Sequence, residues 1–236
     1  MSAGPVDLYA PSEASQPTSA VNRSSSRYLI YAALLLIVAF FGAIRYRLRD
    51  IPLERDEGEF AYGGQLILEG APLYANLYTL KMPGTYAAYA GVMAVLGQSR
   101  AGIHTGLIFI NAVTTLLVFL LTARLFGRLA GIVAAASYAA LSSSPSVLGF
   151  AAHATHFVVL FAVAGLCLLV AALDDGKPWL TFCSGVLFGM AFLMKQPAAS
   201  LMVFAALYAI WHARRSSAGW AGLIRQVAGF PDIIVI

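Results

Sequence analysis

A succession of apolar segments, separated by short polar breaks, constrains the fold of this chain most strongly. Hydrophobic residues make up 60% of the sequence and charged residues only 11%, whereas soluble globular domains have about 45–50% apolar and about 25% charged residues. Segments of this length and polarity are typical of membrane-spanning helices. The sequence therefore predicts an all-α integral membrane protein, a polytopic bundle of transmembrane helices.

The apolar segments divide the chain into about six spans under the usual length criterion. They cover residues 28–44, 105–123, 129–141 (extending through Ser144), 153–173, 179–194 and 198–212. Residues 1–27 are rich in Ser, Pro and Ala and are expected to form a disordered cytoplasmic tail. The leader is too long and polar for a signal peptide, so the first span is expected to be an uncleaved anchor. The transmembrane domain then covers residues 28–213, and residues 214–236 form a C-terminal tail.

The region between the first two spans, residues 45–104, is a long polar-to-amphipathic loop. Within it, residues 59–68 could form a short helix. Residues 85–96 are apolar but too short to span a bilayer, which favours an interfacial or re-entrant helix. Pro83 and Gly84 indicate a fixed turn rather than a regular helix just before it.

The basic residues predict the orientation of the bundle through the positive-inside rule. With the N-terminus inside, the cytoplasmic basic residues are Arg23, Arg27, Arg124, Arg128, Lys177, Arg214 and Arg215. Asp174 and Asp175 then lie in an inner, solvated loop. Four arginines are exceptions on the outer side, where their charge could serve an anionic ligand: Arg45, Arg47, Arg49 and Arg55.

This topology gathers most of the remaining ionisable residues on the outer face. They are Asp56, Glu57, Glu59, Lys81, His153, His156 and Lys195. Carboxylates held beside a membrane are costly and indicate a functional site. Together with two lysines that could contact a phosphate, they favour a general base that acts on a lipid-phosphate substrate.

Each of these residues also has a structural interpretation. Asp56 could be an acid that stabilises a helix N-terminus. Lys81 and Lys195 could be anchors whose ammonium groups reach the membrane surface. His153 and His156, at i and i+3, could bind a metal, but capping of a helix is favoured because no third ligand lies nearby in sequence.

The sequence predicts no metal site and no certain cofactor, although a divalent ion near Asp56 and a donor phosphate stays open. Cys167 and Cys183 lie inside apolar segments and are interpreted as small hydrophobic residues, with a disulfide only if their helices face each other. The net charge of +4 is explained by topology and does not indicate a nucleic-acid partner.

Several motifs together resemble the GT-C glycosyltransferases of family 39, relatives of protein O-mannosyltransferases and of lipid A aminoarabinose transferases. Asp56-Glu57-x-x-Phe60-Ala61 is similar to the family's Asp-Glu-x-x-Tyr-Ala signature after the first span. Lys81-Met82-Pro83 resembles its Lys-Pro-Pro loop. The run from Gly189 to Lys195 resembles a later Gly-x-x-x-x-x-Lys element, and 124–131 resembles an inner turn. The similarity covers residues 28–213.

The resemblance implies a sugar donor linked to a polyprenyl phosphate and an acceptor hydroxyl on a lipid, a glycan or a protein. Transfer would invert the anomeric centre on the outer face. Asp56 would be the general base with Glu57 in support, Lys81 and Lys195 would bind the donor phosphate, and Glu59, His153 and His156 could assist. The resemblance places the chain in a bacterial inner membrane, with the active face periplasmic or extracellular.

The chain departs from the family pattern in three ways. Met82 replaces the first proline of Lys-Pro-Pro, and residues 152–157 lack the second acid that many members carry. Members are usually much longer, which predicts that this chain is the N-terminal portion of such a protein. Two other functions remain open: a non-catalytic binder or flippase-like carrier of polyprenyl-phosphate sugars, and an inactive fragment. The sequence does not name the sugar or the acceptor.

Overall fold

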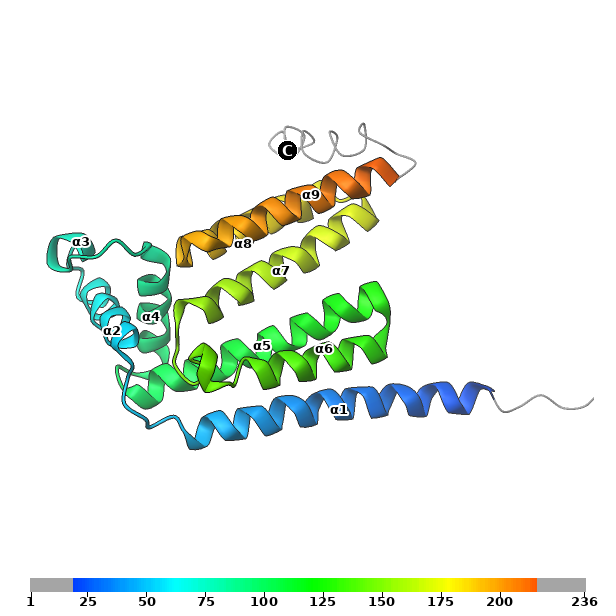
Figure 1. The fold of residues 1–236 in the computed structure, drawn as a ribbon, viewed down its shortest axis with the longest axis horizontal. Helices are drawn as coiled ribbons and strands as arrows, with labels where there is room; N and C mark the ends of the chain where they lie inside the picture. Colours follow the sequence, from blue (N-terminus) through cyan, green and yellow to red (C-terminus); the bar gives the residue numbers. More distant parts are fainter. Residues whose placement is uncertain (1–18, 216–236) are drawn as a thin grey trace, which may run out of the picture.

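The computed structural model describes the backbone of residues 19–215 and the side chains of residues 27–215. Within this range all regular structure is helical, as predicted (Figure 1). The predicted tails therefore lie largely outside the described residues. Residues 19–27, which we expected to be disordered, already belong to the first helix, α1 (Ser19–Arg47).

Three helices are long and apolar enough to cross a membrane: residues 27–47 of α1, α5 (Arg100–Phe126) and α7 (Ala154–Asp175). The other predicted spans are also helical, as α6 (Arg128–Leu141), α8 (Pro178–Met194) and α9 (Ala199–Arg215), but each is shorter. Within the described residues, three of the six predicted spans therefore meet the length criterion. The 14 residues of α6 extend over about 21 Å at the usual rise per residue, less than the hydrocarbon core of a bilayer.

The helices of the bundle run side by side along one common direction (Figure 1). α7 packs against α8 and α5, α5 packs against α6, and α1 covers α5 and α6. Gly127, with φ of 93°, separates α5 from α6 in a backbone conformation that side chains disfavour. The chain can therefore reverse there within one residue, and α5 and α6 form a hairpin.

One end of the bundle carries the basic residues that the sequence assigned to the inner side. Arg124 at the end of α5 contacts Asp174 at 2.8 Å, and Lys177 contacts Asp175 at 3.1 Å. These four side chains are each about half exposed. Asp174 and Asp175 thus lie at the end remote from Asp56, as expected, but they are ion-paired.

The opposite end of the bundle is capped by three helices from the loop 45–104. They are α2 (Arg55–Leu68), α3 (Leu73–Asn76) and α4 (Pro83–Leu96), with α2 packed on α4. Pro83 and Gly84 were expected to form a turn, but they open α4. Proline fits the first helical position because its missing N–H has no partner there.

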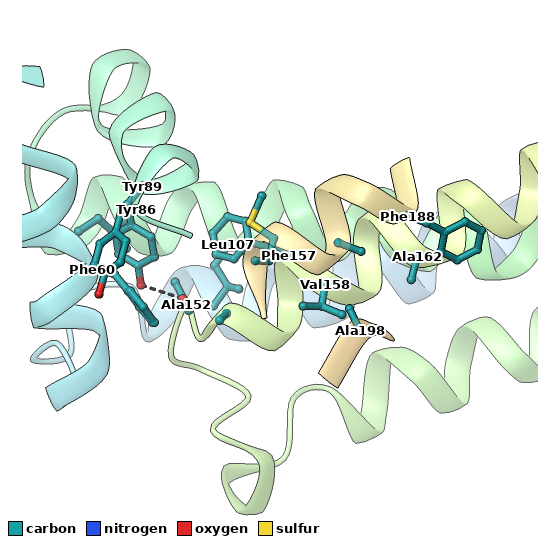
Figure 2. Close-up of a cluster of buried hydrophobic side chains, with 14 of the residues drawn as sticks. Phe60, Tyr86, Tyr89, Leu107, Ala152, Phe157, Val158, Ala162, Phe188 and Ala198 are labelled. Atoms are coloured by element: carbon teal, nitrogen blue, oxygen red, sulfur yellow. Dashed lines mark hydrogen bonds between the residues drawn. The ribbon is translucent and has the colours of Figure 1, made fainter. Parts of the chain in front are cut away.

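A buried aromatic cluster fastens this cap to the bundle. Phe60 from α2 meets Tyr86 and Tyr89 from α4, and Tyr89 in turn contacts Phe157 of α7 (Figure 2). The Tyr89 hydroxyl donates a hydrogen bond of 2.7 Å to the carbonyl of Ala152, which satisfies its polar end (Figure 2). The cap is therefore packed firmly against the start of α7.

Arg45 has a structural role that the sequence did not reveal. We expected it on the outer side, available to an anionic ligand, but it is buried. Its guanidinium donates to the carbonyl oxygens of Gly149 and Ser142, which belong to the loop after α6. Arg45 therefore ties the end of α1 to that loop. Cys167 and Cys183 are both free thiols.

Candidate active site

A cavity of about 300 Å³ opens where the cap meets the bundle. Its walls come from the first turn of α2, the segment before α4, the start of α7 and the break between α8 and α9. Its charged and polar lining residues are Asp56, Lys81, His153, Lys195 and Gln196, and its apolar lining residues are Phe60, Leu80, Met82, Ala154, Met194 and Pro197. Four of the seven residues predicted for the site meet in this cavity.

Asp56 is positioned by a capping box at the start of α2. The Glu54 side chain accepts a hydrogen bond from the Asp56 N–H, and the Glu57 side chain accepts one from the Glu54 N–H. Asp56 therefore lies in the first helical turn, where negative charge is favoured. Its carboxylate is 22% exposed. The structural interpretation of Asp56 as a helix N-terminal acid is thus confirmed, and the same geometry presents it to the cavity.

Glu57 is not among the residues that line the cavity. Its side chain is 1% exposed and accepts hydrogen bonds from His104 of α5 at 3.1 Å and from the Ala152 N–H at 2.5 Å. Burial acts to raise the pKa of Glu57, but these bonds outweigh burial and hold the pKa below its usual range. Glu57 therefore braces α2 against α5 and the segment before α7.

Lys81 is the counter-ion of two carboxylates. Its ammonium lies 3.2 Å from Asp56 and 2.8 Å from Glu59, above the ring of Phe60. Burial acts to raise the pKa of Asp56, but the hydrogen bond and charge of Lys81, with Arg55 in addition, hold the pKa below its ordinary value. Asp56 is therefore ionised at neutral pH.

Lys195 occupies the break between α8 and the short 3-10 helix Gln196–Ala198. Among the described residues, its ammonium has no hydrogen bond or ion pair with any other side chain. Lys195 thus differs from Lys81, although both were interpreted alike from the sequence. It is the cation in this cavity that is available to an anion.

Gly84 explains why these two lysines share one cavity. A Cβ at this position would lie 2.6 Å from the carbonyl oxygen of Leu193, so only glycine lets α4 approach the end of α8 this closely. The Thr85 hydroxyl then donates a hydrogen bond of 2.9 Å to the Met194 carbonyl. The sequence Pro-Gly-Thr after Met82 therefore docks the Lys81 segment beside Lys195.

The two histidines are separated rather than paired. His153 precedes α7 with an extended backbone, so the i, i+3 rule for helical neighbours does not apply. Its Nε2 lies 3.5 Å from Asp56, and its Nδ1 lies 3.0 Å from the Thr155 hydroxyl. His156 is buried in the bundle beside Asn111. Only His153 belongs to the cavity.

The charge state of His153 follows from its neighbours. Burial lowers its pKa most, and the positive charge of Lys195 lowers it further, while Asp56 acts in the opposite direction. The net effect is a pKa below the usual value, so the imidazole is neutral at pH 7. A neutral imidazole can donate from one nitrogen to Asp56 and accept at the other from Thr155.

Other functionally placed residues escaped the sequence analysis. His104 is a single histidine in an apolar segment, and Thr79 and Tyr86 carry no motif, yet all three bind the carboxylates of α2. The sequence held only a weak indication of these contacts. A polar residue inside an apolar segment is expected to have a hydrogen-bond partner. Among residues 27–215, no group of three or more His, Cys, Asp or Glu side chains is placed to hold a metal ion.

A family model described as dolichyl-phosphate-mannose-protein mannosyltransferase matches residues 81–229. This range is more than half of the 236 residues. The chain belongs to this family. It is a membrane glycosyltransferase of the GT-C type, as the motifs predicted. The matched range includes Lys81, His153 and Lys195 but begins after Asp56. No curated protein and no solved structure matches the chain significantly.

Proposed function

We propose that this protein transfers a sugar from a polyprenyl-phosphate donor to an acceptor hydroxyl, with Asp56 as the general base and Lys195 as the main phosphate contact. The observation that carries this proposal is that one cavity holds both the ionised carboxylate of Asp56 and the ammonium of Lys195, which has no hydrogen bond or ion pair with another side chain in the described part of the chain. A carboxylate can take a proton from the acceptor, and an ammonium can stabilise a departing phosphate.

The chemistry needs few groups because the donor is already activated. The acceptor oxygen forms a bond to the anomeric carbon as the bond from that carbon to the phosphate oxygen breaks, which inverts the centre. The acceptor proton goes to Asp56, and the phosphate departs with the electron pair beside Lys195. No general acid is required, since a phosphate is a stable leaving group, and most of the rate comes from orientation and charge.

The surroundings of Lys195 suit an amphipathic donor. Lys195 lies at the end of the apolar helix α8, between Met194 and Pro197. Leu80, which also lines the cavity, leaves 89% of its surface exposed. A prenyl chain could cover such apolar side chains while its phosphate reaches the lysine. The basic residues at the opposite end of the bundle support an orientation with this cavity on the outer face.

The remaining site residues take supporting roles in this proposal. Glu57 and His104 hold α2 in place from behind the cavity. His153, whose Nε2 lies 3.5 Å from the Asp56 carboxylate, orients that carboxylate toward the acceptor. Lys81 shares its single positive charge between Asp56 and Glu59. His156 has no part in the reaction.

The first experiment is transfer of labelled sugar from a panel of polyprenyl-phosphate sugars in membranes that contain the protein. Asp56→Asn should abolish transfer while the protein inserts normally. Asp50→Asn is the matched control, because Asp50 is exposed and, among the described residues, forms its one ion pair with Arg49 at 3.6 Å. Equal transfer by both variants would refute Asp56 as the base.

A non-catalytic carrier of polyprenyl-phosphate sugars is the second candidate. The ion pair between Asp56 and Lys81 favours it, because a carboxylate with a lowered pKa is a weaker base. A carrier would still bind the donor through Lys195. This function would be supported if the protein binds a donor but transfers no sugar from any donor of the panel.

A further inference from the structure

Glu59 lies behind Asp56, outside the cavity lining, and its carboxylate is held by three partners. It lies three residues after Asp56 in α2, on the same helix face. Its Oε1 accepts hydrogen bonds from the Tyr86 hydroxyl at 2.5 Å and the Thr79 hydroxyl at 2.9 Å. Its Oε2 contacts the Lys81 ammonium at 2.8 Å. Three partners therefore fix the carboxylate in one place.

The backbone of Lys81 is held by two hydroxyl groups, one of which, that of Thr79, also binds Glu59. The Lys81 N–H donates to the Thr79 hydroxyl at 3.2 Å, and the Lys81 carbonyl accepts from the Tyr74 hydroxyl at 3.0 Å. The Lys81 side chain can therefore shift only by exchanging its partners. Its ammonium lies nearer to Glu59, at 2.8 Å, than to Asp56, at 3.2 Å.

We propose that Glu59 is a positioning residue that holds the Lys81 ammonium away from full pairing with Asp56 and so preserves the basicity of the catalytic carboxylate. This assignment rests on the proposed function of Asp56. Glu59 itself does not line the cavity and touches neither substrate. It acts through Lys81.

Charged and titratable side chains from three elements face Asp56. Arg55 lies 3.5 Å away on the same helix, Lys81 comes from the segment before α4, and His153 comes from the start of α7. Lys195 faces His153 across the cavity. Glu59 is the carboxylate that shares Lys81 with Asp56. Removing its charge leaves the whole ammonium to Asp56 and removes a nearby negative charge, and both changes favour the ionised form of Asp56.

The decisive variant is Glu59→Gln, which keeps an oxygen for Tyr86 and Thr79 but removes the charge. We expect the acid limb of the kcat/KM profile to shift to lower pH and kcat on the plateau to fall roughly three- to tenfold, part of the 10²–10⁴ that a general base supplies. Glu69→Gln is the matched control, since Glu69 is exposed at the end of the same helix. An acid limb that stays in place or moves upward in Glu59→Gln overturns the proposal.

Tyr86→Phe separates position from charge, because it removes one anchor of Glu59 and leaves its carboxylate. It should shift the acid limb in the same direction as Glu59→Gln, by less. An unchanged profile in Tyr86→Phe would show that the anchoring has no effect and would overturn the positioning role. Tyr86→Phe also tests the positioning role if Glu59→Gln fails to fold.

An isotope-edited infrared titration of the Asp56 carboxyl, assigned by its loss in Asp56→Asn, needs no activity. In Glu59→Gln the Asp56 band should titrate at lower pH than in the unaltered protein. If the band shifts but the unaltered protein transfers no sugar, the proposed function is refuted and the coupling of Glu59 to Asp56 through Lys81 stands. Transfer with an unshifted band would refute the coupling alone.

Discussion

Replacing Glu57 with alanine should destabilise the fold by about 3–5 kcal/mol, the cost of breaking a buried ionic contact by removal of one partner. The structure supports the upper range. Glu57 is 1% exposed and His104 is 3% exposed, and the carboxylate also accepts from the Ala152 and Glu54 N–H groups. Alanine would leave the two buried donors, His104 and Ala152, without their acceptor, at about 1–3 kcal/mol each.

The assay is reversible unfolding in mixed micelles, with Glu57→Gln and His104→Ala measured beside Glu57→Ala. Glutamine keeps one acceptor oxygen and should lose about 1–3 kcal/mol. The double variant should be far less destabilised than the sum of the single ones, because the two side chains share one interaction. A loss below about 1 kcal/mol in Glu57→Ala would refute the reasoning, since it would show that these donors are satisfied without the carboxylate.

Three further predictions concern separate parts of the molecule. Lys195→Gln should raise the KM for the donor by about tenfold or more, the usual scale for a charged hydrogen bond, whereas Lys177→Gln at the opposite end should leave KM unchanged. Arg45→Met should cost about 2–3 kcal/mol in micelle unfolding, because the carbonyls of Ser142 and Gly149 lose a charged donor. The acid limb of the kcat/KM profile should lie below the ordinary range of an aspartate carboxyl, because Lys81 outweighs burial and holds the pKa of Asp56 below its usual value; an acid limb above that range would contradict this.

Local patterns predicted much of the fold. Long apolar segments identified every helix of the bundle, because a segment that satisfies its own backbone can be judged without its neighbours. The acids at the start of α2 were also predictable, since helix N-termini favour negative charge. The turn assigned to Pro83 was wrong because a proline fits both a turn and the first position of a helix.

Contacts between distant segments could not be predicted. Glu57 was paired with Asp56 in the sequence, but the capping box turns it toward His104, 47 residues further along the chain. Lys81 and Lys195 looked equivalent, and only the folded chain shows that one is neutralised while the other is available. Arg45 was similarly misjudged, because its acceptors lie about 100 residues away.

The central claim is that Asp56 removes the acceptor proton and does not serve chiefly to bind the donor. The direct test measures donor affinity and sugar transfer on the same purified Asp56→Asn protein. We expect donor binding within about threefold of the unaltered protein and a transfer rate lower by about 10²–10⁴, the contribution of a general base. Transfer that persists at a similar rate, or that falls only in proportion to a loss of donor affinity, would contradict it.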